Sequence, residues 1–436
     1  MHLTGRKHEE KQIKKRRGKM PSRIVLMTGG VETLTYFSKE LGNVFEEKGY
    51  KVFYYDLKES ETCFSRLKRF LKPKETVLIT FNHIGLSQED LLYRTQQGYI
   101  WEQSQIPVYN ILVDHPLYYH NHLSHPIKNY HYIGIDKKHI QYVENYYPDV
   151  KVCGFLPLAG MRMPEKRPEK QPEEQPEKQP EEQKEEQKEE QKEEQKEKRE
   201  IPVLFTGNYQ APEKFNTYIE RIDEEYTQFY HKIIDRVLAE SEKTLEEVAK
   251  KCCLDEMGTI SDKDFAEVLA HMNFIDLYVR NVRRGNVVRT LLDAGVSVEV
   301  VGDGWEKLES KHPELLKIHP QMDTRTCLEL MQQAKISLNV MPEFKDGAHD
   351  RIFSSILNGA VSVSDDSRYL RECLPEGVGI CYYDRNHLAE LPEIVKHLLA
   401  VPREREEIVL KGKAEVEKKH TWRQRAEQLI EWIEAV

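Results

Sequence analysis

Short apolar runs alternate with longer amphipathic stretches along the first third of the chain. Such runs are typical of buried strands, and side chains that recur at helical spacing between them are typical of packed helices. Strands are predicted at about 23–27, 51–55, 76–81, 107–113, 131–135 and 150–155, with a helix at about 33–48. This alternation predicts an open, doubly wound α/β domain with a parallel sheet.

The same alternation returns after residue 200. Strands are predicted at about 201–206, 296–301, 315–319, 335–340, 360–364 and 380–384, and helices at 324–333, 387–400, 404–419 and 421–434. About ninety residues of helical character separate the first two of these strands, whereas a parallel crossover needs only a dozen or more. Residues 212–285 are therefore predicted to be a helical insertion, with Arg280, Arg283 and Arg284 on a basic face.

Two stretches lack this alternation. Residues 1–20 are polar and basic, and residues 164–200 consist mainly of Glu, Lys, Gln and Pro. Neither has an apolar face that could join a core, so a disordered tail and a disordered charged linker are expected. The expected domains are residues 21–163 and 201–418, followed by a final helix at 419–436.

Composition narrows the possible functions. The formal net charge is −9, and residues 164–200 carry 15 Glu against 10 Lys and Arg. Without a basic field, the chain is not expected to bind nucleic acid. It has no apolar run long enough for a transmembrane segment, and no signal peptide is expected. The seven cysteines include no CxxC pair, and reduced thiols, with Cys252 and Cys253 buried, are typical of a cytoplasmic protein.

The helix predicted after residue 347 begins with unusual charges. His349 and Arg351 fall in its first turn, where the helix dipole favours negative charge. A bound phosphate would reconcile the two, because backbone N–H groups and Arg351 could hold it together. The alternative is a surface ion pair of Arg351 with Asp346 or Asp350.

Polar groups also follow the strands of the first domain. Gly29 and Gly30 would allow close approach of a ligand, although the full G-x-G-x-x-G fingerprint is absent. Asp114 and His115 follow a strand end, where either could accept a proton from a hydroxyl. Because neighbouring side chains of an extended segment point oppositely, one of the two is expected to face the cleft. Alternatively, Asp114 caps the next turn and His115 packs against tyrosines.

Three further histidines follow in the same region. His120, His122 and His125 raise the possibility of zinc, but no Cys or carboxylate stands at metal-ligand spacing beside them. No metal site is therefore predicted.

Three motifs of the second half resemble a known family. VVGDGW, LNVMPEFKDGAHDRIFSSILNGAVSVSDD and ICYYD are similar to sequences of the spore-maturation (CgeB-like) branch of GT-B glycosyltransferases. The resemblance is good over residues 275–435 and looser over 201–275. Over residues 23–160 it depends mainly on the Asp-His-Pro after a strand and on the order of the elements. It implies two Rossmann-like doubly wound domains and a nucleotide-sugar donor.

The resemblance also implies roles for single residues. Arg351 and His349, with Asp350 in the same helix start, would contact the donor diphosphate. The Gly207-Asn208 turn would assist them, while Gly29 and Gly30 would belong to the donor site in the first domain. Gly302, Gly304 and Trp305 would lie near the base and ribose, and Asp365 and Tyr383 would close the donor pocket. The first domain would supply the acceptor contacts and the base, Asp114 or His115. The final helix, from Trp422, would return to the first domain.

One departure from the family pattern concerns the sugar. Ser354 and Ser362 stand where many retaining GT-B enzymes have paired glutamates. No D-x-D follows a predicted strand, so no metal cofactor is expected, and protein cations with the helix N-terminus would neutralise the leaving group. The leading hypothesis is metal-independent transfer of a sugar from a nucleotide-diphosphate sugar to an acceptor hydroxyl on a glycan, protein or small molecule. The alternatives are a sugar-nucleotide epimerase or hydrolase, and a non-catalytic nucleotide-sugar-binding or assembly protein.

Overall fold

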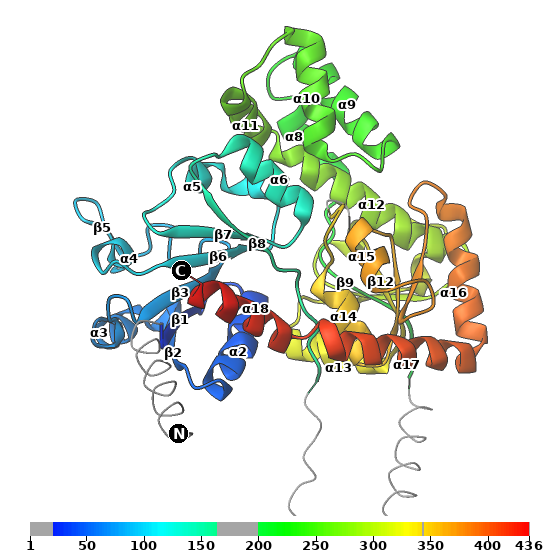
Figure 1. Ribbon diagram of the computed structural model, residues 1–436. Helices are drawn as coiled ribbons and strands as arrows, with labels where there is room; N and C mark the ends of the chain where they lie inside the picture. The colour runs from blue at the N-terminus through cyan, green and yellow to red at the C-terminus, as the bar shows by residue number, and fades with distance from the viewer. Residues whose placement is uncertain (1–20, 164–198, 342–343, 436) are drawn as a thin grey trace, which may run out of the picture.

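The computed structural model describes residues 21–163, 199–341 and 344–435. The expected basic tail and nearly all of the expected linker lie outside the described residues. Two α/β domains stand side by side, and each is built on a six-stranded parallel sheet (Figure 1). The predicted fold class is confirmed. No helix of the described residues is long and apolar enough to cross a membrane.

The N-terminal sheet has the strand order β2-β1-β3-β6-β7-β8. Its strands are β1 (Arg23–Thr28), β2 (Lys51–Asp56), β3 (Thr76–Phe81), β6 (Val108–Leu112), β7 (Tyr130–Gly134) and β8 (Lys151–Phe155). The main helices are α2 (Glu32–Glu47), α3 (Ser60–Phe70), α4 (Ile100–Gln103), α5 (His120–Ser124) and α6 (Lys137–Tyr146). Nearly all side chains of β1, β3 and β6 are buried, as expected for strands covered on both faces. The strand order reverses between β1 and β3, and ligands of such sheets bind beyond the carboxyl ends at this point.

The second sheet has the order β11-β10-β9-β12-β13-β14. Its strands are β9 (Ile201–Thr206), β10 (Val298–Val301), β11 (Leu316–His319), β12 (Ala334–Asn339), β13 (Val361–Ser364) and β14 (Ile380–Tyr382). Its helices are α13 (Thr324–Gln333), α14 (Asp350–Leu357), α15 (Arg368–Cys373), α16 (Leu391–Ala400) and α17 (Pro402–Lys419). The order reverses between β9 and β12, so the carboxyl ends of these strands mark the switch point of this domain.

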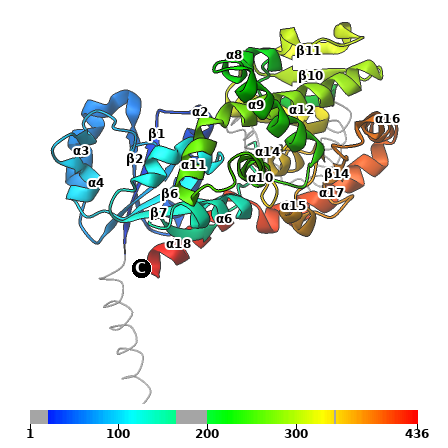
Figure 2. The same cartoon turned by 90° about the horizontal axis from the view of Figure 1, so that it is seen from above.

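Helices fill the long connection between β9 and β10. They are α8 (Asn216–Ile219), α9 (Glu224–Ala239), α10 (Leu245–Met257), α11 (Asp262–His271) and α12 (Asn273–Asp293). The expected boundary at residue 285 falls inside α12, which continues as the crossover helix of the second domain. The insertion also packs on the N-terminal domain, where Phe265 of α11 contacts Tyr146 of α6 at 5.5 Å between ring centroids (Figure 2). The insertion therefore joins the two domains.

The last helix, α18 (Trp422–Glu434), leaves the second domain and lies against α2 of the first (Figure 1). Trp422 is buried between Phe37 and Phe81, with ring centroids 4.7 and 6.2 Å away. Lys48, just after α2, pairs with Glu427 of α18 at 2.7 Å on the surface. The final helix is therefore a second connection between the two domains, in addition to the helical insertion.

Candidate functional site

A cavity of about 220 Å³ lies where α14 begins, between the two domains. We call it the α14 cavity. The carboxyl ends of β9 and β10, helix α13 and the first turns of α14 form most of its wall, and Thr33 and Met161 complete it from the N-terminal side. It therefore occupies the switch point of the second domain, with the first domain as a cover.

Arg351 lies in this cavity and not on the open surface. Its Nη1 donates a hydrogen bond to the carbonyl of Thr206 at the end of β9. Among the ion pairs of the described residues it pairs with neither Asp346 nor Asp350, and Asp346 pairs with Lys137 instead. The guanidinium is held beside the Gly207-Asn208 turn, which lines the same cavity together with Asp350. The guanidinium and the first backbone N–H groups of α14 therefore lie at the same cavity.

Two arginines of α12 reinforce the positive charge. Arg280 and Arg284 are four residues apart, so they lie on one face of the helix, and both line a cavity that also contains His349. Burial, then the neighbouring Arg280 and Arg351, lower the pKa of Arg284 to about 9. The sequence predicts only that these arginines belong to a basic face of the helical insertion. Their spacing of four residues indicates that they lie on one side of a helix, but no local sequence feature indicates that this helix passes over the site.

The second cavity, of about 50 Å³, brings groups of both domains together. We call it the Asp114 cavity. Asp114 and His115 reach it from the end of β6, His349 from the start of α14, and the two arginines from α12. The base candidates of the first domain thus face the cations of the second.

His115 is already engaged. Its Nδ1 accepts a hydrogen bond from the backbone N–H of Leu117 at 3.1 Å, so it is His115, and not Asp114, that caps the following turn. The ring packs against His139 and Tyr142, with centroids 4.6 and 5.1 Å away. Burial holds the pKa of His115 well below its ordinary value. In the neutral ring the other nitrogen then carries the proton, so it can donate but has no lone pair for a substrate proton.

The carboxyl group of Asp114 is held by hydrogen bonds from Asn82 and Tyr119. Its Oδ2 accepts a hydrogen bond of 2.9 Å from Nδ2 of Asn82, whose own Oδ1 accepts from the N–H of Val113. Asn82 thereby fixes the carboxylate without protonating it. Of the two residues, Asp114 is therefore the one whose chemistry suits a general base.

His349 is neutral and oriented. Asn339 donates through Nδ2 to the Ser364 hydroxyl, so its Oδ1 is the acceptor that faces Nδ1 of His349 at 3.0 Å. The imidazole therefore donates from Nδ1 and keeps Nε2 as an acceptor. Burial, then Arg351 and Arg284, hold the pKa of His349 well below its ordinary value. An uncharged acceptor of this kind suits a sugar hydroxyl better than a phosphate.

Of the residues expected near the base and ribose, Gly302 lines the α14 cavity, whereas Gly304 and Trp305 are not in its wall. Gly302 lines the α14 cavity with φ of 140°, and a side chain on it would collide with the carbonyl of Gly207. Gly304 has φ of 87°, and a side chain there would collide with Tyr209. Trp305 is 0% exposed and donates from Nε1 to the Gly207 carbonyl at 2.8 Å. The indole therefore positions the turn from behind and cannot touch a ligand directly.

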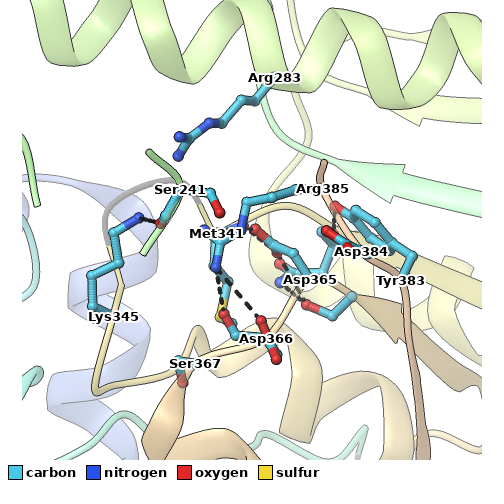
Figure 3. A network of polar contacts seen from close by, with 12 residues as sticks. Ser241, Arg283, Met341, Lys345, Asp365, Asp366, Ser367, Tyr383, Asp384 and Arg385 are labelled. Atoms are coloured by element: carbon cyan, nitrogen blue, oxygen red, sulfur yellow. Dashed lines mark hydrogen bonds and ion pairs between the residues drawn. The ribbon is translucent and has the colours of Figure 1, made fainter. Parts of the chain in front are cut away.

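Asp365 and Tyr383 border a different cavity, of about 170 Å³. Arg283 of α12 lines the same cavity, and Figure 3 shows its guanidinium on the side of Ser241, with Arg385 beside Asp365. Asp365 accepts a 2.7 Å hydrogen bond from the N–H of Met341 and lies 3.7 Å from Arg385, while Tyr383 donates to the Asn339 carbonyl at 3.0 Å. These residues hold the strand end that carries the site, and they are not in the wall of the α14 cavity.

The remaining expected residues are dispersed. Gly29 and Gly30 form the turn after β1, where Gly29 packs against Asp56, and Thr33 from the following helix reaches the α14 cavity instead.

Within the described parts of the chain, no three His, Cys, Asp or Glu side chains gather as metal ligands. His120 faces the hydroxyl of Tyr147, and His122 stacks on His83. All seven cysteines are unpaired, with Cys252 and Cys253 buried.

The C-terminal part of the chain is similar to glycosyltransferases. The family model described as glycosyl transferase-like matches residues 283–431, which is less than half of the chain. This match covers the second half of α12, the turn after β10 and all of α14, but it does not include the turn after β9. No curated protein sequence matches the chain.

Solved structures give distant likenesses. Anabaena HepE in complex with UDP-glucose is 10% identical with a TM-score of 0.47, and the alignment covers 95% of this chain and 100% of HepE. T4 phage BGT in complex with its UDP-glucose substrate is 12% identical with a TM-score of 0.45, and the alignment covers 95% and 98%. TarM is 8% identical with a TM-score of 0.42. That alignment covers 85% of this chain, which spans 57% of the length of TarM.

Proposed function

We propose that this chain, whose second domain is glycosyl transferase-like, transfers a sugar from a nucleotide-diphosphate sugar to an acceptor hydroxyl. The observation that carries the proposal is the meeting of two sets of groups. Arg280, Arg284 and Arg351 converge from the second domain, and Asp114 faces them from the first. The arginines would neutralise the charge of a leaving diphosphate, and Asp114 would accept the proton of a hydroxyl nucleophile.

The proposed division of labour follows from the cavities. The nucleotide would occupy the α14 cavity beside the Gly207-Asn208 turn, with its diphosphate against the start of α14 and Arg351. The sugar would point toward the Asp114 cavity, where His349 accepts a hydrogen bond from one of its hydroxyls. Asp114 would accept the acceptor proton as the new glycosidic bond forms and the bond from the anomeric carbon to the diphosphate breaks. The closer relationship to the spore-maturation branch is part of this proposal.

Charge neutralisation by side chains makes a resident metal unnecessary in this scheme. Three arginines and the dipole of α14 would stabilise the departing nucleoside diphosphate, because preorganised donors act strongly in a site shielded from water. We therefore expect turnover to persist in the presence of EDTA.

The test is a calorimetric screen of nucleoside diphosphates and their sugars, followed by assays of nucleotide release with and without candidate acceptors. A transferase binds at least one nucleoside diphosphate and releases it faster when the acceptor is present. Equally fast consumption of the donor without any acceptor would instead identify an epimerase or hydrolase. Binding without turnover under any condition would identify a non-catalytic binding protein.

A further inference from the structure

The largest cavity described lies inside the N-terminal domain and away from the start of α14. It has a volume of about 520 Å³ and is bounded by the end of β3, the hairpin of β4 (Tyr93–Arg94) and β5 (Gly98–Tyr99), and α5. We call it the His83 cavity. Half of its lining residues carry aromatic rings: His83, Tyr93, Tyr99, His122, His125 and Tyr130.

The strand end that presents His83 is conformationally unusual. Asn82 and His83 have φ of 48° and 58°, a region that residues with side chains rarely adopt and that costs of order 1–3 kcal/mol per residue. Specific bonds maintain it, because Asn110 Oδ1 accepts from the N–H of His83 at 2.9 Å and the Tyr130 hydroxyl meets His83 Nε2 at 2.9 Å. Such strain is found where a surface must be preformed, and here it fixes one wall of the cavity.

The wall is aromatic but carries no permanent charge. The imidazoles of His83 and His122 stack at 4.4 Å between centroids, and burial lowers the pKa of both, so they are neutral at pH 7. Among the described lining residues there is no Lys, Arg, Asp or Glu, whereas Ser87 and Asn121 add neutral hydrogen-bonding groups. A phosphate or carboxylate would find no counter-charge here. A ligand ring that has both an apolar face and hydroxyl groups would pack on the aromatic side chains and form hydrogen bonds with the neutral polar groups.

The cavity adjoins the reacting groups. Asn82, immediately before His83, donates to the Asp114 carboxylate. Tyr119 lies 5.1 Å from the His83 ring between centroids, and burial and the nearby Asp114 raise the pKa of its hydroxyl. Asn82 and Tyr119 thus connect the surroundings of His83 with Asp114, which lines the Asp114 cavity. A molecule bound in the His83 cavity could extend a hydroxyl toward the Asp114 cavity.

We infer that the His83 cavity binds a neutral sugar ring of the acceptor, so that the acceptor is a glycan or glycoside. This inference rests on the proposed function and adds the class of the second substrate to it. Stacking on Tyr93 and His122 would hold the ring, and the neighbouring side-chain amide and hydroxyl groups would select its orientation.

Binding is tested without any donor. Saturation-transfer NMR would be recorded with methyl glucoside, methyl galactoside, methyl N-acetylglucosaminide, the anionic methyl glucuronide, and phenol. At least one neutral glycoside should bind, and Tyr93→Ala and His122→Ala should weaken it about tenfold, which corresponds to about 1.4 kcal/mol. Tyr218→Ala is the matched control, because Tyr218 is an exposed tyrosine of the insertion, outside this cavity. Unchanged melting temperatures would show that the variants are folded.

The outcomes separate this inference from the proposed function. Failure of every neutral glycoside, binding of phenol or the glucuronide alone, or equal binding by the wild type and both cavity variants would overturn the sugar subsite. If glycosides bind as expected but no nucleotide sugar is ever consumed, the subsite stands and the transferase proposal fails. If transfer occurs, the cavity variants should raise the acceptor KM while donor affinity stays unchanged.

Discussion

Arg351 is the residue with the most direct tie to the proposed leaving group. Its guanidinium is held by the Thr206 carbonyl and faces the α14 cavity, so Arg351→Ala would remove a charge-assisted contact worth about 1.5–3 kcal/mol. We expect the Kd for the nucleoside diphosphate to rise about tenfold or more, measured calorimetrically. Arg325→Ala, which changes an exposed arginine at the start of α13, is the control. Unchanged affinity in the Arg351 variant would remove its role.

Substitutions of the neighbouring residues Asp114 and His115 are expected to have different effects, the first on kcat and the second on stability. Asp114→Asn keeps the size of the side chain but removes its basicity, so kcat should fall about 10²–10⁴-fold, the usual contribution of a positioned base, with donor affinity unchanged. His115→Asn should mainly lower stability, because it removes the ring that packs on His139 and Tyr142. Steady-state rates and melting temperatures of both variants distinguish the roles. A kcat that falls only in the His115 variant would contradict the assignment.

His420 is a buried histidine whose titration should be visible in stability. It stacks on Phe353 at 4.6 Å, and burial, then Arg425, lower its pKa to about 3. The unfolded chain takes up this proton near pH 6.5 and the folded protein does not, so stability falls as the pH drops from 6.5 toward 3, by up to about 1.4 kcal/mol per pH unit. His420→Gln should flatten the dependence of the melting temperature on pH between 6.5 and 4.5. The same change at the exposed His312 should leave the slope as it is.

At the scale of elements, local patterns predicted the strands and most helices, whereas long-range packing decided the rest. Each predicted strand of both sheets is present, because buried parallel strands require continuous apolar runs that are visible in the sequence. The hairpin of β4 and β5 was missed, since each of its strands has only two residues. The burial of Trp305 and the separate cavity of Asp365 were also missed, because both depend on contacts between strand ends that are distant in sequence.

The final helix allows a prediction about cooperativity. α18 follows the second domain in sequence, but Trp422 is packed into the first domain between Phe37 and Phe81. Trp422→Ala should cost about 3–5 kcal/mol, the usual range for truncating a buried tryptophan, and should destabilise the N-terminal domain. Trp422→Phe should cost much less, because it keeps a ring there and removes a buried Nε1 for which the described residues offer no partner. Denaturant unfolding of the three proteins measures both effects.

At the scale of the whole molecule, the contacts between the domains hold a closed arrangement. Glu32 at the start of α2 accepts hydrogen bonds from the N–H and the hydroxyl of Thr324 at 3.0 and 2.6 Å, so a carboxylate of one domain caps a helix of the other. Asp136 accepts from the N–H of Asp346 at 2.8 Å, just before the loop that leads into α14. Closure therefore also positions His349 and Arg351.

The cavities are too small for a donor in this closed arrangement. They measure about 220 and 50 Å³, whereas ligand sites typically have about 300–1,000 Å³, so the domains must separate to admit a nucleotide sugar. Glu32→Ala removes two bonds across the cleft and should shift the free protein toward the open state. Small-angle X-ray scattering of the free protein should then show a larger radius of gyration than that of the wild type.

The same contact can be broken from the other domain. Thr324→Val removes the 2.6 Å bond to Glu32 but keeps the size of the side chain. Since both changes act on one interaction, the double variant Glu32→Ala with Thr324→Val should open the protein little more than Glu32→Ala alone. Glu46→Ala, at the far end of α2, should leave the scattering unchanged. If the Glu32 variant keeps the wild-type radius and the wild-type kcat, then the Glu32–Thr324 contact does not govern closure, and the positioning of α14 must depend on Asp136 and the α12 helix instead.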